Sequence, residues 1–131
     1  MTKSVKVFSL EEANAVLPQL ESLLAEFEAK HEAFQQLEDN LFFEEILENA
    51  APPETRLKEL EERLARLEEE ITKIQNLGCL LRHPERGWVD FLARREKEWI
   101  CYCWRRGEQE IQFFHTLRGG FFERQPLAQT V

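Results

Sequence analysis

The sequence predicts an α+β protein in which an antiparallel, coiled-coil-like hairpin of two long helices is followed by a small three-stranded antiparallel β-meander. Apolar residues recur every three or four positions through residues 9–78, which is the period of a helix. From residue 88 onward the period changes to two, and aromatic and β-branched residues become frequent, as in strands. A length of 131 residues is typical of one domain. We therefore expect a single domain over 1–131, with the helical hairpin at 9–78 and the β-meander and C-terminal tail at 79–131.

The first helical segment has a clear start and an internal break. Ser9 and Glu12 have the spacing of a capping box, in which each side chain accepts a hydrogen bond from the other residue's backbone amide. Apolar residues then follow at helical spacing as far as Leu41. Pro18 interrupts this segment, because it lacks an amide donor and crowds the preceding turn. We expect either a kink near residues 14–17 or a short helix followed by a longer one.

The second helical segment carries a heptad pattern. A connector containing Pro52 and Pro53 precedes it, and Gly78 is well suited to end it. The short connector favours antiparallel packing of the two helices. The apolar seam recurs at alternating steps of three and four and consists of Leu57, Leu60, Leu64, Leu67, Ile71 and Ile74.

This seam can serve as core within one chain or as an interface between two chains. Packing against the first helix is the default interpretation. However, Phe42, Phe43, Ile46 and Leu47 add apolar surface that one partner helix cannot cover. We therefore expect a homodimer that forms through the helices.

The three strands of the meander are expected at Trp88–Leu92, Trp99–Trp104 and Ile111–His115, separated by charged turns. His83–Gly87 is expected to form a turn before the first of them. Phe121 and Phe122 are expected to pack against the sheet.

Charge is unevenly distributed along the chain. Residues 1–81 carry 8 Lys and Arg against 18 Asp and Glu, whereas residues 82–131 carry 9 against 7. The chain lacks the strongly basic face that duplex nucleic acid requires, so we do not expect a nucleic-acid partner. The slightly basic C-terminal part is compatible with a protein partner or a small anionic ligand.

Location is inferred from apolar runs and cysteines. No run approaches the roughly 18–20 residues of a membrane-spanning helix, and the N-terminus lacks the apolar core of a signal peptide. Three cysteines, an odd number, favour reduced thiols. We expect a cytoplasmic protein that does not associate with membranes.

Polar side chains with catalytic or binding potential gather in the β-rich part. Carboxylates and an imidazole can bind a divalent metal or act as an acid–base pair, and an arginine can hold an anionic group. A divalent metal is the one cofactor considered, with Asp90, Glu110 and His115 as its candidate ligands. The candidate polar site consists of Asp90, Glu108, Glu110, His115 and Arg124.

Structural roles compete with these chemical ones. No motif with metal-ligand spacing is present, so the preferred interpretation is that the polar residues are solvated or hold turns. Cys101 and Cys103 point to the same side of their strand, but the chain lacks the second cysteine pair of a typical zinc site. His115 would have to join them across the sheet. Buried free cysteines that act as small apolar residues are the simpler explanation.

The chain resembles a family of uncharacterised prokaryotic proteins, the domain of unknown function 2203. The resemblance rests on FSLEEANAVLP at Phe8–Pro18, PERGWVDF at Pro84–Phe91, the Cys103-Trp104 pair, GEQE at Gly107–Glu110 and RQPL at Arg124–Leu127. These motifs occur in the family's order and span nearly the whole chain. The family usually has a glycine in the turn where this chain has Arg94–Lys97. The resemblance implies a small cytoplasmic protein and no known activity, cofactor or partner.

Two functions of different classes follow. The first is a non-enzymatic binding module that assembles through its helices and presents a polar site on the β-meander. The alternative is a small metal-binding or metal-dependent hydrolase-like domain that uses Asp90, Glu108, Glu110 and His115. If these four side chains converge on one point in a cleft, the metal-dependent function is favoured; if they are scattered over the sheet, the binding module is favoured.

Overall fold

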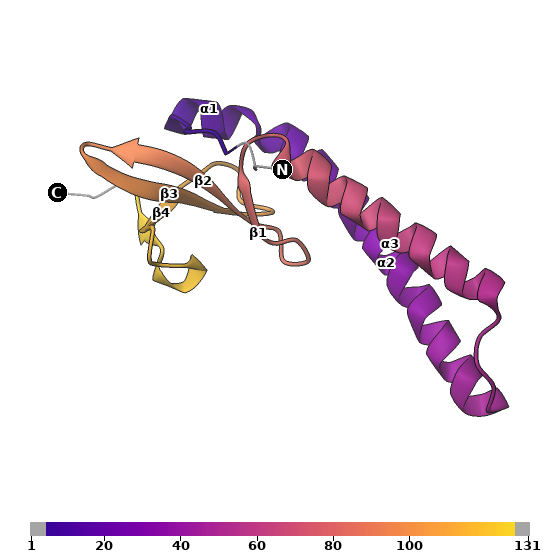
Figure 1. The fold of residues 1–131 in the computed structure, drawn as a ribbon. Helices are drawn as coiled ribbons and strands as arrows, with labels where there is room; N and C mark the ends of the chain where they lie inside the picture. The colour runs from indigo at the N-terminus through magenta and orange to yellow at the C-terminus, as the bar shows by residue number, and fades with distance from the viewer. Residues whose placement is uncertain (1–4, 128–131) are drawn as a thin grey trace.

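The computed structural model describes residues 5–127 and has the expected α+β architecture (Figure 1). Three helices come first: α1 (Leu10–Ala15), α2 (Leu17–Glu48) and α3 (Glu54–Gln75). A five-stranded antiparallel sheet follows, in the order β1-β2-β3-β4-β5. Its strands are β1 (Leu80–His83), β2 (Trp88–Arg95), β3 (Glu98–Arg105), β4 (Phe113–Thr116) and β5 (Gln125–Pro126), and the short 3₁₀ helix η1 (Phe121–Glu123) lies between the last two.

The prediction of three strands was wrong, because the sheet has five. The predicted strands correspond to β2, β3 and β4, and the predicted turn before Trp88 joins β1 to β2. The sequence does not reveal β1, because a four-residue apolar run directly after a helix shows no clear period. It does not reveal β5 either, since that strand has two residues, one of them Pro126.

The helix break lies where Pro18 requires it. The capping box of Ser9 and Glu12 is present at the start of α1, which ends after six residues. Pro18 then occupies the first turn of α2, where no intrahelical amide donor is needed. The second predicted alternative, a short helix followed by a longer one, is therefore confirmed.

Helices α2 and α3 lie side by side and project away from the sheet as an arm (Figure 1). Arg63 Nη1 donates to the carbonyl oxygen of Ala33 at 2.7 Å, and Arg56 pairs with Glu44 at 3.3 Å. Within the described residues, no helix is both long enough and apolar enough to cross a membrane.

Burial along the arm is uneven. Leu67 and Ile74 of the heptad seam are buried, Leu60 and Ile71 are half-buried, and Leu57 and Leu64 are each 43% exposed. The arm also exposes large apolar side chains of both α2 and α3. We call this set the outer apolar patch; it consists of Phe42, Phe43, Ile46, Leu47, Leu57 and Leu64.

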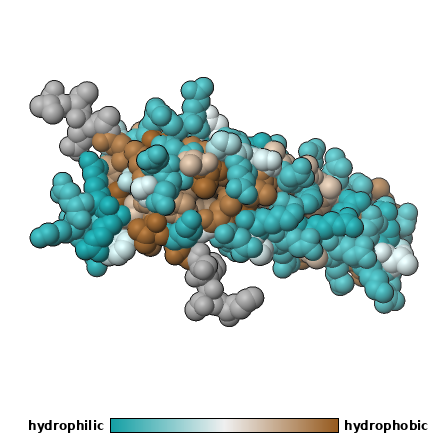
Figure 2. Space-filling model, turned by 90° about the horizontal axis from the view of Figure 1, so that it is seen from above, coloured by the Kyte–Doolittle hydropathy of each residue, from teal (hydrophilic) through white to brown (hydrophobic). Residues whose placement is uncertain are grey.

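The main core lies between the helices and one face of the sheet. Leu17, Leu20 and Ile74 pack there with Val89 and Trp104, among other buried residues. Seen from above, apolar residues gather over this part of the molecule, whereas the arm is mostly polar (Figure 2). Because successive side chains of a strand alternate between faces, the residues between these core positions point to the opposite face.

Candidate functional site

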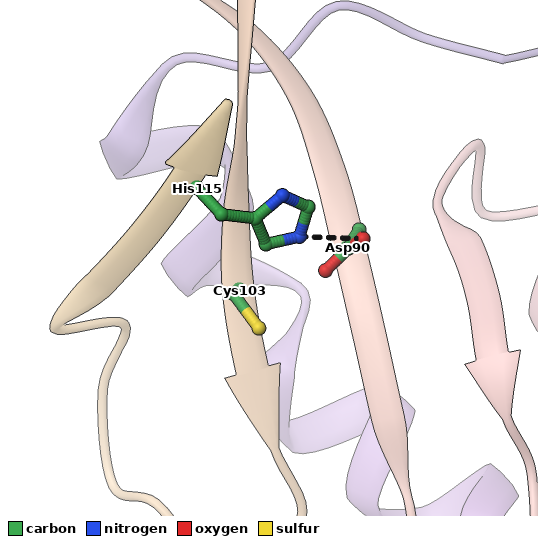
Figure 3. A group of neighbouring side chains, drawn as sticks. All are labelled: Asp90, Cys103 and His115. Atoms are coloured by element: carbon green, nitrogen blue, oxygen red, sulfur yellow. Dashed lines mark hydrogen bonds and ion pairs between the residues drawn. The ribbon is translucent and has the colours of Figure 1, made fainter. Parts of the chain in front are cut away.

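The opposite face of the sheet brings together three polar side chains from three strands. Asp90 of β2 lies directly across from Cys103 of β3, and His115 of β4 lies directly across from Cys101. Residues paired in this way in an antiparallel sheet share a face. Asp90, Cys103 and His115 therefore point toward one another (Figure 3). We call them the Asp–Cys–His group.

The Asp–Cys–His group is compact and almost completely buried. One potential ligand atom from each residue lies within 4.8 Å of the other two. Asp90, Cys103 and His115 are 3%, 1% and 2% exposed. A buried charge is costly unless hydrogen bonds or an opposite charge stabilise it. The hydrogen-bond partners of Asp90 and His115 therefore show which charges and protons this site can hold.

Hydrogen bonds determine which nitrogen of His115 carries a proton. Nδ1 lies 2.7 Å from the carbonyl oxygen of Thr116, and a carbonyl oxygen can only accept. Nδ1 is therefore the donor. Nε2 faces Oδ2 of Asp90 at 2.9 Å, so in the absence of a metal a further proton must lie between these two acceptors.

Arg82 of β1 compensates the charge of Asp90 from the other side. Its Nε donates to Asp90 Oδ2 at 2.9 Å. The Arg82 side chain is 52% exposed, whereas that of Asp90 is 4% exposed. The ion pair therefore fixes the carboxylate while the arginine remains accessible to solvent.

The environment of Cys103 does not favour the thiolate that a nucleophilic cysteine requires. Burial and the nearby carboxylate of Asp90 raise the pKa of the Cys103 thiol to about 12. Burial likewise raises the pKa of Cys101 and raises that of Cys79 to about 11. His115 cannot act as the base of a Cys–His–Asp triad in this arrangement, because one ring nitrogen is bonded to Thr116 and the other faces Asp90.

A cleft of about 410 Å³ opens beside the Asp–Cys–His group. Asp90 and Cys103 line it, and its walls include Arg82, Trp88, Leu117, Phe121 and Phe122. We call it the aromatic cleft. The rings of Trp88 and Phe121 are stacked, with centroids 4.1 Å apart and planes 3° apart. Phe122 is 82% exposed, so the expectation that both phenylalanines pack against the sheet was wrong for this residue.

The structure brings together some of the residues that the sequence suggested and separates others. Asp90 and His115 are in contact. Glu108 instead pairs with Arg124 at 3.1 Å and accepts from the backbone amide of Arg105 at 2.7 Å, so it holds a turn. Glu110 is exposed and does not belong to the group.

Two members of the site were not singled out by the sequence. Cys103 was considered with Cys101 and His115 as a zinc site but was interpreted as a small buried apolar residue, since nothing in the sequence gives the register that places it opposite Asp90. Arg82 lies in a strand that was not predicted. Alternation places Asp90, Cys103 and His115 each on a defined face of its own strand, but it does not show that the three faces coincide.

The chain is thus an α+β protein with a buried Asp–Cys–His group beside an aromatic cleft. Residues 6–127 match the family model described as Uncharacterized conserved protein (DUF2203), so the chain belongs to this family, as the resemblance predicted. No curated protein and no solved structure matches the chain. The family description assigns no activity, and function has to be argued from the geometry.

Proposed function

We propose that this protein binds a divalent transition metal ion, with zinc as the best fit, through Asp90, Cys103 and His115. The observation that carries the proposal is the convergence of an oxygen, a sulfur and a nitrogen ligand from buried residues within 4.8 Å of one another. Zinc accepts all three ligand types, and sites with three protein ligands leave a fourth position for water or a small ligand.

The surroundings of the group support metal binding. Metal-bound histidines commonly donate their second ring N–H to a backbone carbonyl, as His115 does to Thr116. Ligands about 2.0–2.3 Å from a tetrahedral zinc ion lie roughly 3.3–3.6 Å apart. Small side-chain movements are therefore enough to place an ion between the three ligand atoms.

The test is a titration of metal-free protein with Co²⁺, whose bond to a thiolate gives an intense near-ultraviolet absorption band. The native protein is expected to develop this band at one equivalent, and Cys103→Ser to lose it. Cys101→Ser is the matched control, because Cys101 lies on the same face of the same strand and is also 1% exposed. An equal loss in both variants, or no band in the native protein, contradicts the proposal.

A second candidate function is self-association, with α2 and α3 acting as a coiled-coil-like helical hairpin. We propose that the outer apolar patch binds a second copy of this chain. Leu57 and Leu64 belong to the same heptad series as the buried Leu67 and Ile74, so the exposed seam continues a contact that the chain already makes. A heptad leucine seam is complementary to itself, as a two-fold interface requires.

Light scattering on the full chain tests this second candidate. A dimer is expected at micromolar concentration, and Leu47→Glu is expected to give a monomer, because Leu47 is 82% exposed and its replacement leaves the core of one copy intact. Gln36→Glu, on the exposed surface of the same helix, is the control for added charge. A monomeric native protein contradicts self-association and leaves metal binding unaffected.

A further inference from the structure

The aromatic cleft has the size and position of a ligand site. Its volume of about 410 Å³ falls within the range that small organic molecules occupy. Asp90 and Cys103 line it, so the cleft reaches two of the three candidate metal ligands. A molecule in the cleft therefore lies next to the proposed metal position.

The charge of Arg82 indicates that an anionic group of a ligand lies near Asp90. Arg82 uses Nε for its ion pair with Asp90, and the side chain is 52% exposed, so its guanidinium is available from the cleft. A guanidinium binds carboxylates well, because its planar donors match the two oxygens. A divalent metal balances the charges of Asp90 and of the Cys103 thiolate, so the charge of Arg82 favours an anionic group here.

The remaining lining of the cleft is largely apolar and aromatic. Phe122 is 82% exposed and lies edge-on to both Trp88 and Phe121, with centroids 5.6 Å away in each case. Leu117, which also lines the cleft, is 54% exposed. Exposed apolar side chains that line one cleft offer a surface that a ligand can cover. Aromatic rings pair well in stacked or edge-to-face arrangements, which favours an aromatic ligand.

We propose that the aromatic cleft binds a small aromatic carboxylate, with its carboxylate directed to the metal position and Arg82 and its ring placed on Phe122. The inference rests on the proposed function, because the bound metal balances the negative charges of its ligands and so leaves the charge of Arg82 for the carboxylate. It goes beyond metal binding by naming the chemical class of the ligand and the side chains that select it.

Calorimetric titration of the zinc-loaded full chain tests the proposal with three probes: phenylacetate, acetate and benzyl alcohol. Phenylacetate is expected to bind at least tenfold more tightly than acetate, which lacks the ring, and than benzyl alcohol, which lacks the charge. Phe122→Ala is expected to abolish the advantage of phenylacetate over acetate. Arg82→Gln is expected to weaken both carboxylates, whereas Arg94→Gln, which alters an arginine that neither lines the cleft nor contacts its rings, is expected to change neither.

Zinc content, measured by elemental mass spectrometry on the same samples, distinguishes a failure of metal binding from a failure of the proposed ligand class. If zinc is bound and phenylacetate shows no advantage over acetate, the ligand class is wrong and the proposed function stands. The ligand class is also wrong if Phe122→Ala leaves that advantage unchanged. If the native protein does not retain zinc, the proposed function fails, and the inference fails with it.

Discussion

His115 Nε2 lies 2.9 Å from Asp90 Oδ2, although the bond from Nδ1 to Thr116 leaves Nε2 without a proton of its own in the neutral ring. Two acceptors at this distance need a cation between them, which is either a proton or a metal ion. Cys103 adds a third ligand atom, and its buried thiol is protonated at neutral pH in the metal-free protein. Metal binding at this site is therefore an exchange of protons for a metal ion.

We predict that metal affinity rises with pH. The pKa of the Cys103 thiol is about 12 in the metal-free protein, so a metal that binds the thiolate at pH 6–8 must displace this proton. Each displaced proton lowers the apparent dissociation constant by about tenfold per pH unit. Zinc titrations at pH 6, 7 and 8, in buffers of different ionisation enthalpy, count the protons released. The native protein is expected to release one more proton than Cys103→Ser; equal release contradicts ligation by the thiolate.

The ion pair between α2 and α3 gives a prediction about stability. Glu70 is 1% exposed, and its Oε1 accepts from Lys30 at 2.5 Å and from Lys73 at 3.0 Å. Its Oε2 has no hydrogen-bond partner among the described residues. Replacing Lys30 leaves the buried carboxylate of Glu70 with Lys73, whose side chain is 57% exposed, as its remaining hydrogen-bond partner. We expect Lys30→Met to lower the free energy of unfolding by about 1–3 kcal/mol, and Lys73→Met by less, in urea denaturation at pH 7.

The same pair predicts how stability depends on pH. The hydrogen bond from Lys30 lowers the pKa of Glu70 below its ordinary value of about 4.5, against the opposing effect of burial. The stabilising contribution is therefore complete above about pH 4.5 and is lost as the pH falls through the lower folded-state pKa. Glu70→Gln is expected to lose less stability than the native protein between pH 5 and pH 3. Identical losses in the two proteins would show that Glu70 is not involved.

The turn between β2 and β3 is strained at one residue. Glu96 has φ = 58°, in the left-handed region that favours glycine. We expect Glu96→Gly to raise the free energy of unfolding by about 0.5–1 kcal/mol. Lys97→Gly is the control, since Lys97 does not have a positive φ. Chemical denaturation measures both, and a loss of stability in both variants would contradict the strain.

The three strands of the candidate site were predictable, but their register was not. Alternation alone places Asp90 and His115 on defined faces of their strands. Their contact depends on Asp90 pairing with Cys103, and a slip of one residue would place Asp90 opposite Trp104, whose side chain is in the core. The two-residue turn that pairs Arg95 with Glu98 sets this register.

Glu108 and Glu110 were poor candidates for a different reason. The sequence suggests that the last of the three strands begins at Ile111, so that both glutamates stand at its start. The strand begins at Phe113 instead, and Ile111 is held by a hydrogen bond from its amide to Asn14 Oδ1 at 2.8 Å. This contact joins residues 97 positions apart, which no local pattern can reveal.

The metal content of the purified, untagged protein tests the central claim most directly. Elemental mass spectrometry is expected to find about one equivalent of zinc or a similar metal in the native chain and in Glu110→Gln, which changes an exposed carboxylate away from the Asp–Cys–His group. Asp90→Asn and His115→Gln are expected to contain far less. A native chain that neither retains nor takes up a divalent metal, or equal metal in all four proteins, would contradict the account.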